Sequence, residues 1–400
     1  MKKIFKYAML FAMACSLTTA MTSCSSNDDD TPQTGQLSEG DKYLQKVLAA
    51  NVDNTINPTY KALADGCEKL NNELEALTPG SITQQQVDNV CKTFLEARAN
   101  YESSEAFLLG AASHFLIDPH IDSWPLGLNE LYNYLKADHK YKITDQSILG
   151  FHGIEFILFR DGKPRKAAEL NSHDSYNQAG IDFTIFSGTQ ELDYAKAVAE
   201  DLRNSVYRLE CSWDENANKE HVKVLDELET VYKTDKGFSY GYEMKNAGDP
   251  TKSTYNTVKL AVSSVLTGDN SAGGIADEVG NTKINNPFSG KDESYIESPY
   301  SYNSLTDFQN NIHSIENVWF GGVEGKRGEY SFHNYFKKYD AKVGQRVETA
   351  ISDALKQIAA IKYPFVKNIK DPQCKNAIKA CQELNDALAA ASDFVGKNNK

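Results

Sequence analysis

The sequence predicts an all-α protein built from two antiparallel helical bundles. Apolar residues recur at helical spacing along most of the chain, as in Tyr60, Leu63, Cys67, Leu70 and Leu74. No segment shows convincing strand alternation, and Gly and Pro residues divide the chain into stretches of helical length. The two halves have a similar layout, so the arrangement could be a duplicated four-helix bundle with a site in the cleft between the bundles.

The first residues resemble a bacterial lipoprotein signal peptide. Lys2, Lys3 and Lys6 precede a mostly apolar stretch that is too short and too interrupted to be a good transmembrane span. The stretch ends in small residues before a cysteine, which resembles a lipobox. We therefore predict a signal peptide over 1–23, lipidation of Cys24 and an acidic tether over 24–38.

The lipid on Cys24 predicts an outer-membrane lipoprotein. Acidic residues at 28–30 follow the cysteine directly, which resembles a surface-export signal of Bacteroidetes lipoproteins. The prediction is a surface-exposed protein, with a periplasm-facing one as the alternative.

Residues 39–187 are predicted to form the N-terminal bundle. A helix over 60–77 ends at Pro79-Gly80, and Ser81 or Thr83 can cap the next helix, which runs to about Tyr101. Residues 111–145 look irregular, 146–160 form a helix, and 161–187 form a polar connection.

Residues 188–400 are predicted to form the C-terminal bundle, with helices over about 189–213, 216–234, 252–267 and 272–281. Ser304 and Asp307 form a capping-box pattern at the start of a helix that ends at Gly321. An apolar stripe over 343–358 predicts the next helix. Asp371, followed by a proline at the first helical position, predicts the cap of the last.

The charge of the chain excludes some classes of partner. Its formal net charge is −13, and removal of residues 1–23 takes away three lysines and no acids, which leaves about −16. An acidic surface disfavours nucleic acid and suits a protein that handles cations. No zinc-finger cysteine spacing occurs, although Cys67 and Cys91 lie on successive predicted helices and could pair in an oxidising compartment.

The sequence Gly150-Phe151-His152-Gly153-Ile154-Glu155 carries the main candidate for chemistry. On a helix, residues three apart share a face, so His152 and Glu155 point the same way from a segment that is too apolar for a surface loop. An imidazole and a carboxylate on one face are a start on a divalent-metal site. A buried ion pair is the simpler alternative.

Acidic residues elsewhere in the first half favour the metal site. Glu102 and Glu105 are three residues apart on the preceding helix, and Asp122 lies in an aromatic-anchored loop. A buried carboxylate needs a partner, which would be a metal ion or Arg98. We predict His152, Glu155, Glu105 and Asp122 as metal ligands, with Glu102 and Arg98 as further binding residues. One histidine with several carboxylates suits iron, zinc or copper.

The second half supplies candidates for a facing wall. Glu297 and Ser298 precede the helix over 305–320, which presents a row of amides that includes Asn311. A solvated helix face has no need of such a row, so these groups could bind a ligand or the other bundle. We predict Glu278, Glu297, Ser298 and Asn311 as this wall.

The chain resembles the imelysin-like proteins. GFHGIEFILF matches their GxHxxE signature, and further matches occur at Ala97-Arg98, Ser104–Phe107, Asp122, Trp124-Pro125, Ala276–Glu278, Glu297–Ser301 and Asp307–Asn311. The resemblance covers nearly the whole chain after the signal peptide. It implies two helical bundles with a site between them, and a cell-envelope lipoprotein related to iron-uptake proteins. In such relatives the segment that matches Asp118–Asp122 and the HxxE helix are implicated in metal binding.

The resemblance leaves the activity open. The family is classed as a peptidase, but HExxH and HxxEH are both absent, and Gly237–Gly241 matches GxSxG without the strand that a nucleophile elbow needs. We therefore predict a protein that binds a divalent or iron-type metal ion for uptake, with a possible uptake-system partner. The alternatives are a metal-dependent peptidase and a surface module that binds a peptide or other ligand without metal.

Overall fold

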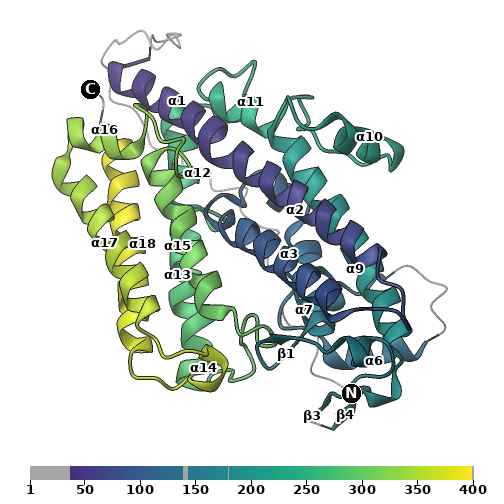
Figure 1. The fold of residues 1–400 in the computed structure, drawn as a ribbon. Coiled ribbons are helices and arrows are strands. Elements are labelled where there is room, and N and C mark those ends of the chain that lie inside the picture. The colour runs from purple at the N-terminus through teal and green to yellow at the C-terminus, as the bar shows by residue number, and fades with distance from the viewer. Residues whose placement is uncertain (1–36, 138–142, 179, 399–400) are drawn as a thin grey trace, which may run out of the picture. The chain divides into compact units, whose positions relative to one another are not determined.

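The computed structural model describes residues 37–137, 143–178 and 180–398, and it confirms the all-α prediction (Figure 1). The predicted signal peptide, Cys24 and all but the last two residues of the tether lie outside the described residues. Residues 38–400 form one compact unit. None of the described helices is both long enough and apolar enough to cross a membrane.

The first half of the chain contains the longest described helix, α9, and two short hairpins. Its helices are α1 (Glu39–Asn51), α2 (Asn57–Glu75), α3 (Gln84–Glu102), α4 (Ala111–His114), α5 (Asp118–Ile121), α6 (Leu128–Lys136), α7 (Gly150–Leu158), α8 (Ala167–Leu170) and α9 (Gly188–Trp213). A π-helical turn, η1 (Val52–Ile56), joins α1 to α2, and short 3-10 turns are η2 (Glu105–Phe107), η3 (Gln146–Ile148) and η4 (Phe183–Ile185). Antiparallel pairs join β1 (Phe159–Arg160) to β2 (Lys163–Pro164) and β3 (Asn177–Gln178) to β4 (Ile181–Asp182).

The second half has the same helical character. Its helices are α10 (Lys219–Glu227), α11 (Tyr240–Lys245), α12 (Val258–Thr267), α13 (Ala272–Asp277), α14 (Asn285–Ser289), α15 (Ser304–Phe320), α16 (Phe332–Tyr339), α17 (Ala341–Ala359) and α18 (Cys374–Lys397). A second π-helix, η5 (Glu278–Ile284), joins α13 to α14, and a 3-10 turn, η6 (Phe365–Lys367), precedes α18.

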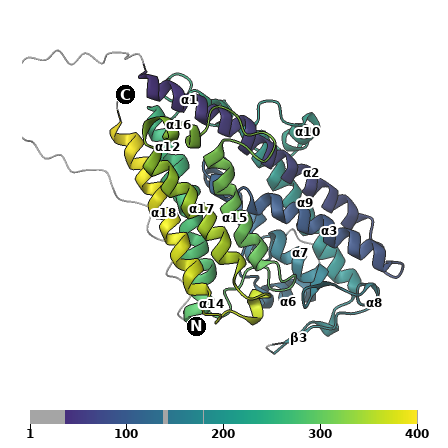
Figure 2. The same cartoon turned by 60° about the vertical axis from the view of Figure 1, so that its left-hand side comes forward.

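The helices pack as two groups that lie side by side in both views (Figures 1 and 2). Helices α2, α3, α7 and α9 pack together, and α12, α13, α15, α17 and α18 form the other group. Helix α15 packs on α3 and on η2, so it joins the groups. Helix α9 packs along α2 and α7, although the predicted boundary at residue 187 assigns it to the second half; that boundary stays a prediction, because residues 38–400 form one unit.

Local sequence explains where the main helices begin. The side chain of Thr83 accepts a hydrogen bond from the backbone of Gln86, and the Gln86 side-chain oxygen accepts one from the backbone N–H of Thr83, so these residues form a capping box at α3. Ser187 and Gln190 form the same arrangement at α9. Each cap satisfies backbone N–H groups that have no partner within the helix.

Several predicted local features are wrong. Ser304 and Asp307 do not cap α15: the Ser304 hydroxyl donates to the carbonyl of Glu297, and Asp307 accepts from Ser298 and Asn303. Asp371 does not cap α18, which begins at Cys374; its carboxylate accepts from the backbone of Lys362 and Gln373 instead.

Other predictions miss local detail. The helix predicted from residue 146 begins at Gly150 after a 3-10 turn, and the stretch read as irregular contains α4, α5 and α6. Cys67 and Cys91 are both buried free thiols, so the possible disulfide is not formed.

Candidate metal centre

Two glycines let α7 lie deep in the protein. Gly150 has φ +76°, and a Cβ there would lie 2.2 Å from the carbonyl oxygen of Ile121. A Cβ on Gly153 would lie 2.3 Å from the hydroxyl of Tyr194. Only glycine permits this backbone approach. It brings the helix that carries His152 against the Asp118–Ile121 turn, and every residue of α7 is buried.

His152 lies between two carboxylates. Its Nε2 is 3.1 Å from Asp122 Oδ1, and its Nδ1 is 3.2 Å from Glu155 Oε2. Burial and the charge of Arg98 act to lower the pKa of His152, but Asp122 and Glu155 outweigh them and raise this pKa to about 9. The same contacts hold the pKa of Asp122 below its usual range: burial acts to raise it, but Arg98 and His152 prevail.

Glu155 joins the signature helix to the segment that precedes α15. Its Oε1 accepts hydrogen bonds from the backbone N–H groups of Tyr300 (3.1 Å) and Ser301 (2.8 Å) and from the Ser301 hydroxyl (2.7 Å). Its other oxygen faces His152. Each carboxylate oxygen therefore has a protein partner.

Arg98 stands at the centre of a buried ionic network. Its guanidinium pairs with Glu102 at 2.6 Å, with Glu297 at 2.7 Å and with Asp307 at 3.5 Å, and it also contacts Asp122. Arg98 and three of these partners are buried, and Asp122 is 9% exposed. A single cation thus holds carboxylates from α3, from the loop after α5 and from the second half of the chain.

Lys283 adds a second buried cation from η5. Its Nζ is 3.1 Å from Glu297 Oε1, 3.3 Å from Asn311 Oδ1 and 3.8 Å from Glu102 Oε2. Asn311 in turn donates to a carboxylate oxygen of Glu102 at 2.6 Å. Burial acts to lower the pKa of Lys283, but the surrounding carboxylates raise it well above its usual value, so the side chain is an ammonium.

A small polar cavity opens beside this network. It has a volume of about 200 Å³ and is walled by Glu105, Asp118, Asp122, Glu278 and Lys283, together with Trp124 and Tyr295. The two aromatic rings lie 3.8 Å apart, and the Trp124 indole donates to the carbonyl of Ile296. Asp269 also lines the cavity; Asp269 and Glu278 are exposed while Glu105, Asp118 and Asp122 lie deeper, so these two carboxylates mark the solvent side.

Carboxylates outnumber cationic groups in this centre. The acids are Glu102, Glu105, Asp118, Asp122, Glu155, Glu297 and Asp307, and the cations that face them are Arg98, His152 and Lys283. Burial raises the pKa of Glu105 well above its usual value, that of Glu297 to about 8, that of Asp307 to about 7 and that of Asp118 to about 6. The centre therefore holds excess negative charge that protons or a further cation must balance.

Comparison with known proteins identifies the family. The sequence pattern of imelysin, peptidase family M75, matches residues 56–391. The chain belongs to the imelysin family. It is 23% identical to iron-regulated protein A of Synechococcus elongatus over 353 aligned residues. The alignment covers 88% of this chain and 84% of that protein. This imelysin-family chain is also similar to the crystal structure of a protein assigned as an iron-regulated protein A precursor from Parabacteroides distasonis, with a TM-score of 0.73, 26% identity, and coverage of 90% of this chain and 97% of that one.

The structure brings the predicted site residues of this imelysin-family chain together. His152, Glu155, Asp122 and Arg98 are in direct contact, Glu102, Glu297 and Asn311 lie around them, and Glu105 and Glu278 line the adjoining cavity. Ser298 donates to Asp307 and has no contact with His152 among the interactions of the described residues. None of these contacts tests whether the residues bind metal, so their ligand roles stay predictions.

Two residues of the centre were missed. Asp307 was interpreted as a helix cap, and Lys283 was not singled out. Lys283 lies among polar neighbours, between Asn281-Thr282 and Asn285-Asn286, so its sequence context carries no signal that it is buried. The amide row of α15 contacts the first half of the chain: Asn311 binds Glu102, and the Ser314 hydroxyl accepts from the backbone of Ala106.

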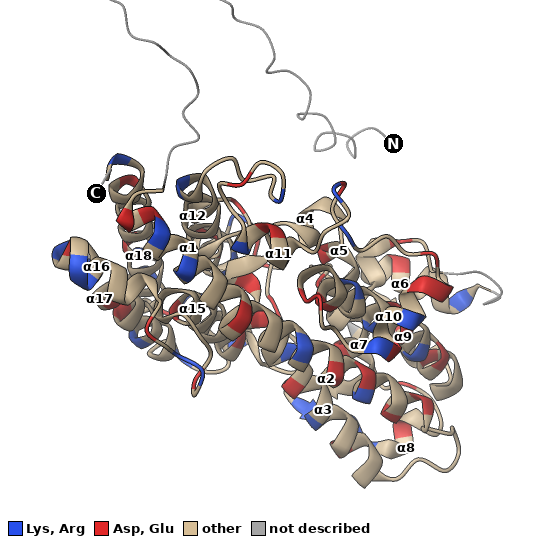
Figure 3. Ribbon diagram, turned by 90° about the horizontal axis from the view of Figure 1, so that it is seen from above, with Lys and Arg blue, Asp and Glu red and all other residues tan. Residues whose placement is uncertain are grey.

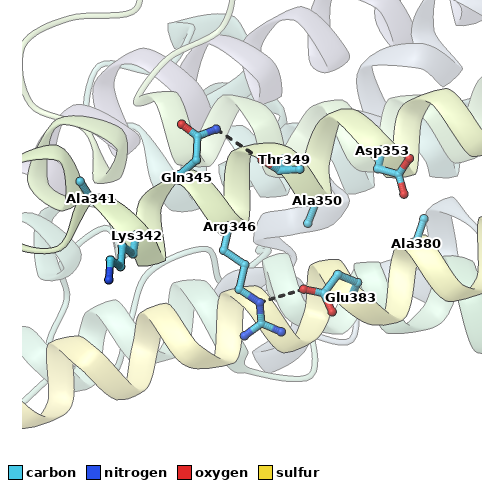
Figure 4. A pocket seen from close by; sticks show the side chains of 9 residues that line it. All are labelled: Ala341, Lys342, Gln345, Arg346, Thr349, Ala350, Asp353, Ala380 and Glu383. Carbon is cyan, nitrogen blue, oxygen red and sulfur yellow. Dashed lines mark hydrogen bonds and ion pairs between the residues drawn. The ribbon is translucent and has the colours of Figure 1, made fainter.

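Two other places lack the features of a reaction centre. Ser239, the middle residue of the GxSxG match, caps α11 through its hydroxyl. The described element directly before α11 is the helix α10, not a strand, so Ser239 is not on a nucleophile elbow. A shallow groove of about 720 Å³ runs between α17 and α18 and is lined mainly by alanines and exposed polar side chains (Figure 4). The ion pair across it, Arg346 to Glu383, is solvent-exposed.

Proposed function

We propose that this imelysin-family protein captures a divalent or iron-type metal ion for uptake. The observation that carries the proposal is the excess of buried carboxylates around a cavity of about 200 Å³. A bound cation would balance this charge where burial otherwise requires protonation. An iron-related role also agrees with the names of its relatives.

The donor set fits such an ion. Asp122, His152 and Glu297 each offer a ligand atom, and these atoms lie within 4.8 Å of one another. Glu297 Oε2 is buried and has no hydrogen-bond partner among the described residues. Glu102, Glu105 and Asp122 form a second such group, so Asp122 links the cavity to His152. One imidazole with carboxylates suits iron, zinc or copper.

Glu155 has a different role in this proposal. Its Oε1 is taken up by Tyr300 and Ser301, and its Oε2 faces His152 Nδ1. A carboxylate that accepts from one ring nitrogen of histidine fixes the ring and leaves the other nitrogen for metal. We assign to Glu155 the role of positioning His152. The residues that would bind the ion itself are Asp122, His152 and Glu297.

The size of the cavity favours an ion over a peptide. Binding sites for drug-sized ligands have volumes of about 300–1,000 Å³, whereas this cavity has about 200 Å³ and polar walls. Acidic positions lie on helices of both groups (Figure 3), which suits a protein that attracts cations.

We also propose that the protein acts at the cell envelope. A lipid on Cys24 would anchor it to the outer membrane, and the acidic residues after Cys24 favour surface exposure. Globomycin treatment of the native host tests the anchor: accumulation of the uncleaved precursor is expected, and an unchanged mature form would contradict it.

A titration of the purified protein with Fe²⁺, Zn²⁺ and Cu²⁺ tests capture. We expect stoichiometric binding of at least one ion, and its loss in the His152→Ala variant. His313→Ala is a matched control, because His313 and Glu316 are also a helical pair three residues apart but His313 is 46% exposed. Binding that survives His152→Ala, or is absent from the wild type, would contradict the proposal.

A further inference from the structure

Lys283 lies on a carboxylate that a metal ion would need. Its ammonium is 3.1 Å from Glu297 Oε1 and 3.8 Å from Glu102 Oε2, and it is 2% exposed. Both carboxylates belong to groups whose ligand atoms are close enough to share an ion. Two positive charges on the same carboxylates repel each other strongly in a buried site. A metal ion on the unpartnered Glu297 Oε2 would be a third cation beside Arg98 and Lys283, so it competes with the ammonium for this carboxylate.

The π-helix η5 places a further carboxylate, Glu278, on the same cavity as Lys283 at the solvent side. In a π-helix the backbone hydrogen bonds join residues five apart, and Glu278 and Lys283 are five apart in η5. Both side chains line the cavity, where Glu278 is exposed and Lys283 is buried. The wide turn thus sets an exposed carboxylate on the same side of the helix as the buried ammonium.

Close packing fixes the backbone that carries Lys283. A Cβ on Gly280 would lie 2.9 Å from Cys381 Cβ and 3.3 Å from the carbonyl oxygen of Ile378, so η5 lies directly on α18. The Lys283 side chain, with four rotatable carbons, is the flexible element here. Its ammonium can change partner while the backbone of η5 stays in place.

We propose that Lys283 is a built-in counter-ion that a captured metal displaces from Glu297 toward Glu278. In the empty protein the ammonium lies against Glu297 and Glu102 and shares both carboxylates with Arg98. When a metal ion enters, it takes over Glu297, and Lys283 swings into the cavity, where Glu278 receives it. The affinity of the site is then set by an internal exchange of cations, which keeps a deeply buried acidic site from holding its cargo too tightly. This inference rests on the proposed metal capture.

A double-mutant cycle on Zn²⁺ affinity tests the exchange. We expect Lys283→Met to tighten Zn²⁺ binding at least about 10-fold, because the competitor is gone. Glu278→Gln should weaken binding several-fold in the wild-type background, because the displaced ammonium has lost its acceptor. The same Glu278→Gln change should have little effect in the Lys283→Met background.

The outcomes separate this inference from the proposed function. Equal weakening by Glu278→Gln in both backgrounds would make Glu278 a simple attractive charge and would overturn the exchange while leaving capture intact. If neither the wild type nor any variant bound Zn²⁺, Fe²⁺ or Cu²⁺, the proposed function would fail and the exchange with it. Binding by Lys283→Met but not by the wild type would show that Lys283 blocks the site permanently, and would overturn both the exchange and the proposed capture.

A measurement on the unmodified protein covers the case in which Lys283→Met does not fold. In crystals of the wild-type chain loaded with Zn²⁺, Lys283 Nζ should have left its position 3.1 Å from Glu297 Oε1 and should contact Glu278. An ammonium still on Glu297 beside bound Zn²⁺ would overturn the exchange.

Discussion

Glu155 and Ser301 form a direct contact between the GxHxxE helix α7 and the segment that precedes α15. Glu155 Oε1 accepts from the Ser301 backbone at 2.8 Å and from its hydroxyl at 2.7 Å, across 146 residues of sequence. The second oxygen of Glu155 faces His152. The GxHxxE helix and the Glu297–Ser301 segment therefore act as one unit, in which Glu155 orients the histidine.

Replacement of Glu155 by glutamine should weaken metal binding without abolishing it. The amide oxygen can still accept from Ser301, but the negative charge beside His152 Nδ1 is lost. Loss of such a supporting partner lowers metal affinity by about 10- to 100-fold. A competition titration with a zinc chelator measures the change. Complete loss of stoichiometric binding would instead show that Glu155 is itself a ligand.

Replacement of Arg98 by methionine should destabilise the fold strongly. Removal of one partner from a buried ionic network costs about 3–5 kcal/mol, because the remaining charges stay buried. Arg346→Met is the matched control: Arg346 also pairs with a glutamate, but it is 43% exposed, and exposed pairs contribute about 0–1 kcal/mol. Urea unfolding measures both values. Similar small losses for the two variants would contradict the central role of Arg98.

The metal-free protein should be more stable at pH 5.5 than at pH 8.5. The pKa of Asp118 is raised to about 6, that of Asp307 to about 7, that of Glu297 to about 8 and that of His152 to about 9. Each group binds more protons in the folded state than in the unfolded state, so stability falls as pH rises through this range.

Urea unfolding with a chelator present, across that pH range, measures this dependence. Asp307→Asn should flatten the slope, since an amide mimics the protonated acid. Stability that rose with pH, or a slope unchanged in Asp307→Asn, would contradict the assignment.

Replacement of Gly150 by alanine should cost more stability than replacement of Gly237. Both glycines have positive φ, +76° and +79°, so both substitutions carry the conformational cost of about 1 kcal/mol. Only the Cβ at position 150 meets another backbone, that of Ile121 at 2.2 Å; nothing lies within 4 Å at position 237. The difference between the two free energies of unfolding isolates the steric clash. Equal losses would show that α7 can move away from Ile121 without cost.

Sequence periodicity was sufficient to predict the helical class and most helices, because each bundle helix buries one apolar stripe, as in α2 and α18. Which helices pack against each other was harder to predict from the sequence. Helix α9 packs on α2 because its apolar residues face that bundle, and periodicity reports a face without naming what covers it. Cap patterns misled where the side chains had a tertiary partner, as with Asp307 and Arg98.

Residue type was enough to predict most of the residues that form the centre, but it did not predict how they are arranged. His152, Glu155 and Asp122 stand out as polar groups in apolar or rigid segments. Which oxygen of Glu155 faces His152, and which faces Ser301, depends on contacts between segments 146 residues apart. The position of Lys283 depends on a π-helical turn, and no simple spacing pattern in the sequence predicts such a turn.

Anomalous diffraction from crystals loaded with Zn²⁺ tests the central claim most directly. We predict one strong peak within about 2.0–2.2 Å of His152 Nε2 and of carboxylate oxygens of Asp122 and Glu297, with no direct Glu155 contact. A peak held by other residues, or none at this centre after loading, would contradict it.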